Sequence, residues 1–293
     1  MIPFYLSLTH LNSMIVYRTK EDLSGHLNSL KREKLSIGLV PTMGALHQGH
    51  GSLVEKAKSE NDVVVVTIFV NPTQFNDPDD LETYPRTLDS DLEKLQKLEA
   101  DLIFVPSVKE MYPEADDRIF DLDPLDKVME GKHREGHFNG VAQIVSKLFQ
   151  LILPHRAYFG QKDFQQLTIV RRLTEILNLD IHIVGCPIVR EKDGLAMSSR
   201  NQRLSKEERK QASFIYDTLK QARKKKEELS VIELKAWVSD RFLLRPEFGL
   251  EYFEIVEDKA LKSILSWDER VNKVACIAVQ LGSVRLIDNV NFD

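Results

Sequence analysis

The stretch DVVVVTIFV, residues 62–70, is apolar almost throughout. A short run of β-branched residues without polar alternation is typical of a strand that is covered on both faces, as strands of parallel sheets are. Shorter runs of the same kind predict further strands at 15–17, 36–40, 101–105, 157–160 and 181–189. We therefore expect a parallel sheet.

Helical patterns alternate with these strands. Residues 52–60 follow the strand at 36–40, and 88–99 open with acidic residues and carry lysines later, as the helix dipole favours. Residues 138–153 are strongly apolar and stop before Pro154, whereas 163–179 begin at Asp163 as the expected N-cap. This alternation predicts a Rossmann-like, doubly wound α/β domain over residues 14–188.

The pattern changes after Arg190. Residues 205–228 predict one long charged helix with Ser205 as its N-cap, followed by a helix at 231–244 and strands at 251–256, 274–281 and 283–287. We interpret this order as a smaller C-terminal α+β domain, a lid formed by residues 189–293. The basic run at 223–226 is flanked by two glutamates and is interpreted as a solvated helix face.

Composition excludes several classes of protein. The 293 residues carry a net charge of −5, which disfavours a general nucleic-acid binder. No apolar run approaches the roughly 20 residues that span a bilayer, so we expect no membrane association. The two cysteines, Cys186 and Cys276, match no metal or redox spacing and fit the core of a reduced, cytoplasmic protein.

The N-terminus is mildly apolar but lacks a basic leader and a clear cleavage site, so a signal peptide is not expected. Residues 1–13 are interpreted as an extension before the first strand. Translation starts at Met1 or at Met14, and the sequence leaves both open.

The richest stretch for chemistry is PTMGALHQGH, residues 41–50, which follows a strand and enters a helix. This setting directs backbone N–H groups and the positive helix end toward a bound phosphate. The spacing of Gly44 and Gly49 matches a P-loop, but His50 and Gly51 stand where Lys and Ser/Thr are required, which excludes one. His47 and His50 then lie on one face of the helix start, as donors that stabilise charge on a leaving pyrophosphate.

Three further stretches carry polar residues at expected strand ends or on loops. GQKD (160–163) supplies the positive charge of Lys162, and REKDGLAMSSRN (190–201) supplies hydroxyl and guanidinium donors on a loop that can close over phosphates. FVNPTQF (69–75) leaves the buried strand at its carboxyl end, where ligands of such sheets bind, and presents Asn71 and Gln74. Each stretch can also be interpreted without a ligand, as a helix cap, a surface loop or a turn.

His133 and His137 have the i, i+4 spacing of zinc ligands on a helix. Gly136 weakens such a helix and no third ligand is near in sequence. We therefore predict no metal site in the protein itself.

Six ordered blocks identify the sequence as similar to a known family. They are PTMGALHQGH (41–50), FVNPTQFN (69–76), YPRT (84–87), HFNGVAQIVSKLF (137–149), YFGQKDFQQL (158–167) and PIVREKDGLAMSSRN (187–201). From about Met14 to the C-terminus the chain closely resembles the pantothenate synthetases, or pantoate–β-alanine ligases, of the HxGH nucleotidyltransferase superfamily. The sequence before Met14 departs from the family pattern.

The resemblance implies an ATP-dependent condensation of (R)-pantoate with β-alanine, through pantoyl adenylate, to give pantothenate, AMP and pyrophosphate. It implies Mg²⁺ carried on the phosphates of ATP, and a homodimer. The implied catalytic residues are His47, His50, Lys162, Ser198, Ser199 and Arg200, with His50 as the proton donor. The implied ATP site comprises Met43, Gly44, Ala45, Leu46, His47, Gln48, Gly49, His50, Gly160, Gln161, Lys162, Asp163, Val189, Met197, Ser198, Ser199 and Arg200. Gln74 and Gln166 would bind pantoate, and Gln74 would also meet β-alanine.

Two alternatives predict different features. Another HxGH enzyme, such as a nicotinamide mononucleotide adenylyltransferase, would lack the FVNPTQF and GQKDFQQL blocks. A nucleotide-sensing or RNA-binding module would need no ordered polar set beyond the phosphate site and would favour a basic surface.

Overall fold

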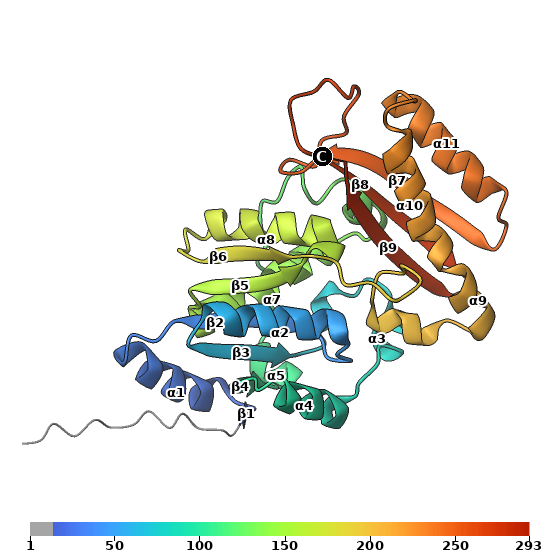
Figure 1. Cartoon of the computed structure of the whole chain (residues 1–293). Coiled ribbons are helices and arrows are strands. Elements are labelled where there is room, and N and C mark those ends of the chain that lie inside the picture. Colours follow the sequence, from blue (N-terminus) through green and yellow to red (C-terminus); the bar gives the residue numbers. More distant parts are fainter. Residues whose placement is uncertain (1–13, 293) are drawn as a thin grey trace, which may run out of the picture.

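The computed structural model describes residues 14–292 (Figure 1). The predicted extension at 1–13 lies outside the described residues. Two sheets organise the described chain, a larger one built from its first part and a smaller one near its C-terminus. No helix within residues 14–292 is long and apolar enough to cross a membrane.

The larger sheet has six strands in the order β1-β4-β3-β2-β5-β6, and all pairs are parallel. The strands are β1 (Ile15–Tyr17), β2 (Ile37–Thr42), β3 (Val63–Ile68), β4 (Leu102–Phe104), β5 (Arg156–Gly160) and β6 (His182–Cys186). The strand predicted from residues 62–70 is β3, which pairs on both sides and is buried from Val64 onward. From β2 the next strands, β3 and β4, are added toward one edge of the sheet, whereas β6 is added beside β5 toward the other edge. The direction in which strands are added therefore reverses between β2 and β5.

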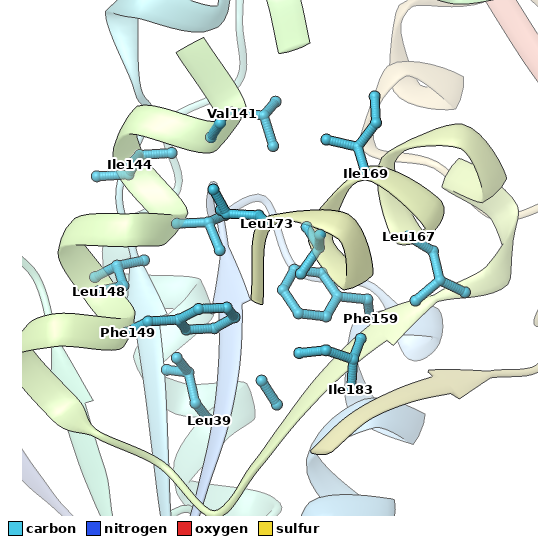
Figure 2. Packing of buried hydrophobic residues seen from close by; sticks show 14 of the residues in the cluster. Leu39, Val141, Ile144, Leu148, Phe149, Phe159, Leu167, Ile169, Leu173 and Ile183 are labelled. Carbon is cyan, nitrogen blue, oxygen red and sulfur yellow. The ribbon is translucent and has the colours of Figure 1, made fainter. Parts of the chain in front are cut away.

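Helices cover both faces of this sheet, which is therefore doubly wound. They are α1 (Lys20–Arg32), α2 (Gln48–Glu60), α4 (Leu88–Lys97), α7 (His137–Ile152) and α8 (Phe164–Ile176). Residues of α1, α7 and α8 share one buried cluster with β2 and β5, in which Leu39, Phe149, Phe159 and Leu173 meet (Figure 2). Residues of α2 and α4 form a second cluster on the opposite face, around Val54 and Leu95.

Shorter helices join these elements. They are η1 (Pro72–Gln74), α3 (Pro78–Glu82), α5 (Val108–Met111), α6 (Met129–His133) and η2 (Gln161–Asp163). Asp163 stands at the N-cap position of α8, but in the described chain its side chain makes no capping hydrogen bond. Helix α7 ends at Ile152. Leu153 follows in the left-handed conformation, with a φ of 50°, and directly precedes Pro154.

The smaller sheet is antiparallel, in the order β7-β8-β9. Its strands are β7 (Phe248–Glu257), β8 (Lys273–Leu281) and β9 (Val284–Asn291), and the helices beside it are η3 (Ser199–Arg203), α9 (Lys206–Gln211), α10 (Ser213–Lys225) and α11 (Val231–Leu243). A separate core cluster joins α10 and α11 to this sheet, with Leu219, Phe242 and Ile277 among its members. Figure 1 shows these helices grouped against the smaller sheet, apart from the six-stranded one.

Contacts also join the two sheets. Cys276, Val256 and Val274 of the smaller sheet belong to the core cluster of the larger one. Glu130 of α6 accepts two hydrogen bonds from Arg285 of β9, both at 2.7 Å. The C-terminal part is thus fastened to the larger sheet by both apolar and charged contacts.

Two sequence predictions need correction. The helix predicted over residues 205–228 is two helices, because the chain takes a tighter turn at Ala212, where the Ile215 N–H reaches the Ala212 carbonyl. Ser205 does cap the first of them. The strand predicted at 181–189 ends at Cys186, since Pro187 has no N–H to continue the ladder.

Candidate active site

The carboxyl ends of β2 and β5 lie side by side, at the point where the strand order of the larger sheet changes direction. Ligands of open parallel sheets bind at such a switch point. The loop 43–47 leaves β2 there and enters α2, and η2 leaves β5 beside it. A cavity of about 200 Å³ lies at this edge.

Fourteen of the residues predicted for the site line this cavity together. They are Met43, His47, Gly49, His50, Gln74, Gly160, Lys162, Asp163, Gln166, Val189, Met197, Ser198, Ser199 and Arg200. The other five, Gly44, Ala45, Leu46, Gln48 and Gln161, are not among the lining residues. Segments that are distant in sequence therefore converge at this cavity.

His47 and His50 cap the start of α2 with their own rings. His47 Nδ1 accepts the Gly49 N–H at 3.1 Å, and His50 Nδ1 accepts the His47 N–H at 3.3 Å. The ring centroids are 4.1 Å apart. Because each Nδ1 accepts a backbone hydrogen, each neutral ring carries its proton on Nε2 and can donate it to a ligand.

Both rings are neutral near pH 7. Burial, together with the nearby charge of Lys162, lowers the pKa of His47 to about 4. Burial lowers the pKa of His50 to about 3, with contributions from His47 and Lys162. Before a ligand arrives, the pair therefore acts as two neutral donors rather than as two cations.

Glycine is required at position 49 by the fold of the loop. A Cβ there would come within 2.8 Å of the His47 ring, which folds back over the helix start. Substitution would displace the ring that caps the helix.

A buried carboxylate on α4, not anticipated from the sequence, holds the loop from behind. Asp91 accepts the N–H groups of Ala45 and Leu46, each at 2.8 Å. It is fully buried, and Thr87 donates to it as well at 3.2 Å. Ala45 has a positive φ of 48°, so these two hydrogen bonds stabilise a loop conformation that alanine rarely adopts.

Lys162 lies on η2, directly after β5. Its side chain is 17% exposed, and its Nζ is 3.8 Å from the Asp163 carboxylate. The histidines and this lysine come from neighbouring strand ends, so one cavity receives two imidazole donors and one cation.

The segment 190–203 forms another wall of the cavity. Ser199 Oγ lies 3.2 Å from Tyr84 Oη, and Ser198 caps η3 by accepting the Arg200 N–H at 3.3 Å. Arg200 donates to Asp80 of α3 at 2.7 Å. The YPRT block thus has a contact with the serine loop, through Tyr84, that sequence reasoning did not assign.

Amide side chains lie at the other end of the cavity. Asn71 Nδ2 donates to the Gly140 carbonyl and to Gln74 Oε1, both at 3.1 Å. Because the Gly140 carbonyl can only accept, the Asn71 side chain must turn its NH₂ group toward it. The same NH₂ group faces Gln74, so Gln74 must turn its Oε1 toward Asn71. Gln74 therefore turns its Nε2 donors toward the cavity, beside Met43 Sδ at 3.1 Å.

His133 and His137 do not form a metal site together. His133 ends α6 and lies 2.8 Å from Glu251, whereas His137 begins α7 and donates from Nδ1 to the Gln74 carbonyl at 2.7 Å. Gly136 between them has a φ of 78°, which breaks the helix that the zinc spacing requires. His137 instead supports η1 behind Gln74.

A doubly wound sheet whose switch point holds capping histidines at a helix start defines an α/β enzyme of the HxGH nucleotidyltransferase class. The family model for pantoate-beta-alanine ligase matches residues 15–291. The chain belongs to this family. It therefore catalyses the ATP-dependent condensation of pantoate with β-alanine to pantothenate, AMP and pyrophosphate.

Individual relatives agree with the family. The pantothenate synthetase of Bacteroides fragilis is 54% identical over 279 residues, which cover 95% of this chain and 99% of the relative. The crystal structure of pantothenate synthetase from Thermus thermophilus has a TM-score of 0.89 at 42% identity and covers 95% of this chain and 99% of that one. A pantoate-beta-alanine ligase from Francisella tularensis, solved with beta-gamma ATP and beta-alanine, has a TM-score of 0.75 at 36% identity, with 96% and 98% covered.

Proposed function

We propose that this chain forms pantoyl adenylate in the cavity at the carboxyl ends of β2 and β5, where His47, His50 and Lys162 bind the triphosphate of ATP. The observation that carries the proposal is the pair of neutral imidazoles whose Nδ1 atoms are committed to the backbone. Their Nε2–H groups are preorganised donors, and such donors stabilise charge that develops in a transition state.

The first step needs no general base. The carboxylate of pantoate is already ionised at neutral pH, so its oxygen attacks the α-phosphorus directly. The bond from that phosphorus to the bridging oxygen breaks, and the electron pair leaves with pyrophosphate. His50 donates from Nε2 to the leaving group, while Lys162, Ser198 and Ser199, with Arg200 in the same loop, stabilise the charged transition state.

The second step joins the two substrates. The deprotonated amine of β-alanine attacks the acyl carbon of pantoyl adenylate. The bond from this carbon to the AMP oxygen breaks, AMP leaves with the electron pair, and the nitrogen releases one proton to solvent. Gln74 and Gln166 hold pantoate, and Gln74 also meets β-alanine. The donor orientation of the Gln74 amide supports contact with an oxygen atom of either substrate rather than with an ammonium group.

The nucleotide is assigned to the remaining predicted residues. Residues 43–50 would form the ATP site. Met43, His47, Gly49 and His50 line the cavity, whereas Gly44, Ala45 and Leu46 would contribute through the shape of the loop. Residues 160–163, Val189 and Met197 hold adenosine. The cavity contacts of Gly160, Val189 and Met197 support this assignment.

Magnesium is proposed to arrive on the phosphates of ATP. Asp163 is the single carboxylate that lines the cavity among residues 14–292, and its side chain is half-exposed. One carboxylate together with substrate phosphates suits Mg²⁺, which keeps several waters, so Asp163 would hold it. When bound, the ion would offset phosphate charge.

We further propose that residues 14–188 form the ATP- and pantoate-binding domain and 189–293 a lid. Separate core clusters support this division. The family resemblance supports a homodimer, which size-exclusion chromatography with light scattering would test. Two free, buried thiols are compatible with the cytoplasm.

Isotope exchange tests the proposed chemistry. Labelled pyrophosphate should enter ATP when pantoate is present and β-alanine is absent, because adenylate formation is reversible. Adding β-alanine should then release AMP. Folded protein that supports net synthesis of pantothenate without any pantoate-dependent exchange would contradict the adenylate route.

A further inference from the structure

Asn289 of β9 reaches the turn that carries Lys162. Its side-chain Nδ2 donates to the carbonyls of Gln161 at 2.8 Å and Lys162 at 3.0 Å. Both partners are carbonyls, which only accept, so the amide can bind them in one orientation only. The side chain is 7% exposed, and these hydrogen bonds are therefore well shielded from water.

The preceding residue of the same strand contacts the segment that leads to Ser198, Ser199 and Arg200. Asp288 accepts two hydrogen bonds from Arg190, at 2.6 and 3.0 Å, and Arg190 also donates to the Asn289 carbonyl at 3.2 Å. Arg190 begins the segment that carries Ser198 to Arg200. Successive residues of a strand face opposite sides, which lets one short piece of β9 hold both walls.

Lys162 depends on such support. The turn η2 has three residues, too few to fix its own geometry, and lysine has a long, flexible side chain. Asn289 holds the carbonyls of the two peptide bonds that flank the Cα of Lys162, which limits how this turn can rotate. The smaller sheet, through Asn289, therefore helps to fix the position of the Lys162 ammonium.

We propose that Asn289 is a positioning residue that aligns Lys162 for adenylate formation from the C-terminal part of the chain. This inference rests on the proposed role of Lys162. Asn289 itself lies behind the turn and touches backbone rather than substrate. Its contribution should therefore appear in the rate of the chemical step and only when Lys162 is present.

The first experiment measures pantoate-dependent pyrophosphate exchange by Asn289→Ala and Asn289→Asp, neither of which can donate to the two carbonyls. We expect the maximal exchange rate to fall about 10- to 100-fold, since small misplacements of catalytic groups have effects of this size. The KM for pantoate should change little. Asn272→Ala is the matched control. The exposed Asn272 donates to Asp258, so this variant should retain full activity.

A double-mutant cycle separates positioning from general damage. In the Lys162→Ala background, Asn289→Ala should cause no further loss of exchange, whereas independent effects would multiply. Circular dichroism and thermal unfolding of each variant restrict the comparison to folded protein. The Asp variant, which keeps the shape of asparagine, serves if the Ala variant does not fold.

Three results would overturn the inference. Wild-type exchange rates in both folded Asn289 variants would remove any role for the residue. Equal losses in the presence and absence of Lys162 would show that Asn289 acts by another route. Full exchange by Lys162→Ala would instead show that the proposed function gives Lys162 the wrong role, a failure identifiable without any Asn289 variant.

Discussion

The imidazole of His50 accepts the backbone N–H of His47 at Nδ1, over 3.3 Å. The HxGH motif therefore does more than bring two side chains to a phosphate. It uses one nitrogen of each ring to cap α2 and thereby assigns the ring proton to the other nitrogen. In the proposed function, helix capping and ligand binding use the same two side chains.

This arrangement predicts the protonation of the free enzyme. The pKa values of His47 and His50 are lowered to about 4 and about 3, so both rings should stay neutral with the proton on Nε2 from pH 8 down to about 5. Nitrogen-detected NMR of the imidazoles measures this directly, with His47→Gln and His50→Gln for assignment. Ionisation of either ring near pH 6.5 would contradict the capping geometry.

The buried histidine behind Gln74 should make stability depend on pH. Burial lowers the pKa of His137 to about 4, and the adjacent Arg134 contributes. The unfolded chain binds this proton near pH 6.5 and the folded chain does not, so the free energy of unfolding should fall as pH drops from 6.5 toward 4.

At pH 5 the expected loss from this one histidine is about 2 kcal/mol relative to pH 7. Urea unfolding of the wild type and of His137→Gln at both pH values measures it. Glutamine keeps a donor for the Gln74 carbonyl but does not titrate, so its stability should fall less. An identical pH dependence in the two proteins would show that His137 does not make this contribution.

Asp91 should matter although it does not line the cavity. In Asp91→Asn one of the two N–H groups of the loop faces an NH₂ group instead of an oxygen, which should cost about 1–3 kcal/mol of stability. Pyrophosphate exchange should fall about 10-fold or more, because the loop that carries His47 is displaced. Asp89→Asn, on the exposed side of the same helix, is the control. An unchanged exchange rate in Asp91→Asn would show that Asp91 is not needed to position the loop that carries His47.

Gln74 should act on pantoate and not on ATP. Because its amide presents N–H donors to the cavity, Gln74→Ala should raise the KM for pantoate and leave ATP binding largely intact. Gln74→Glu should be worse than Gln74→Ala, since it places a carboxylate against the carboxylate of the substrate. Calorimetric titration with ATP and steady-state kinetics with pantoate separate the two effects. A selective loss of ATP binding would contradict the assignment.

Local patterns predicted the parts of the fold that depend on neighbours in sequence. The apolar run at 62–70 became the doubly covered strand β3, and the strand, loop and helix around His47 and His50 follow the order that the sequence indicated. Cap signals such as Ser205 were also confirmed. The family blocks then brought together residues that periodicity alone could not place.

The residues missed by sequence reasoning are those whose partners are far along the chain. Asp91 is 46 residues from Ala45, and Asn289 is 127 residues from Lys162. Nothing near Asp91 or Asn289 in sequence distinguishes them from a surface acid or a polar strand residue. Their roles depend on how α4 packs behind the loop and on how the smaller sheet meets η2, and these are tertiary contacts.

The most direct test of the central claim is pantoate-dependent pyrophosphate exchange by His50→Ala. We expect the exchange rate of folded protein to fall at least about 100-fold, the usual effect of removing one preorganised donor. Exchange at close to the wild-type rate would show that the His50 ring is not the donor that this site relies on.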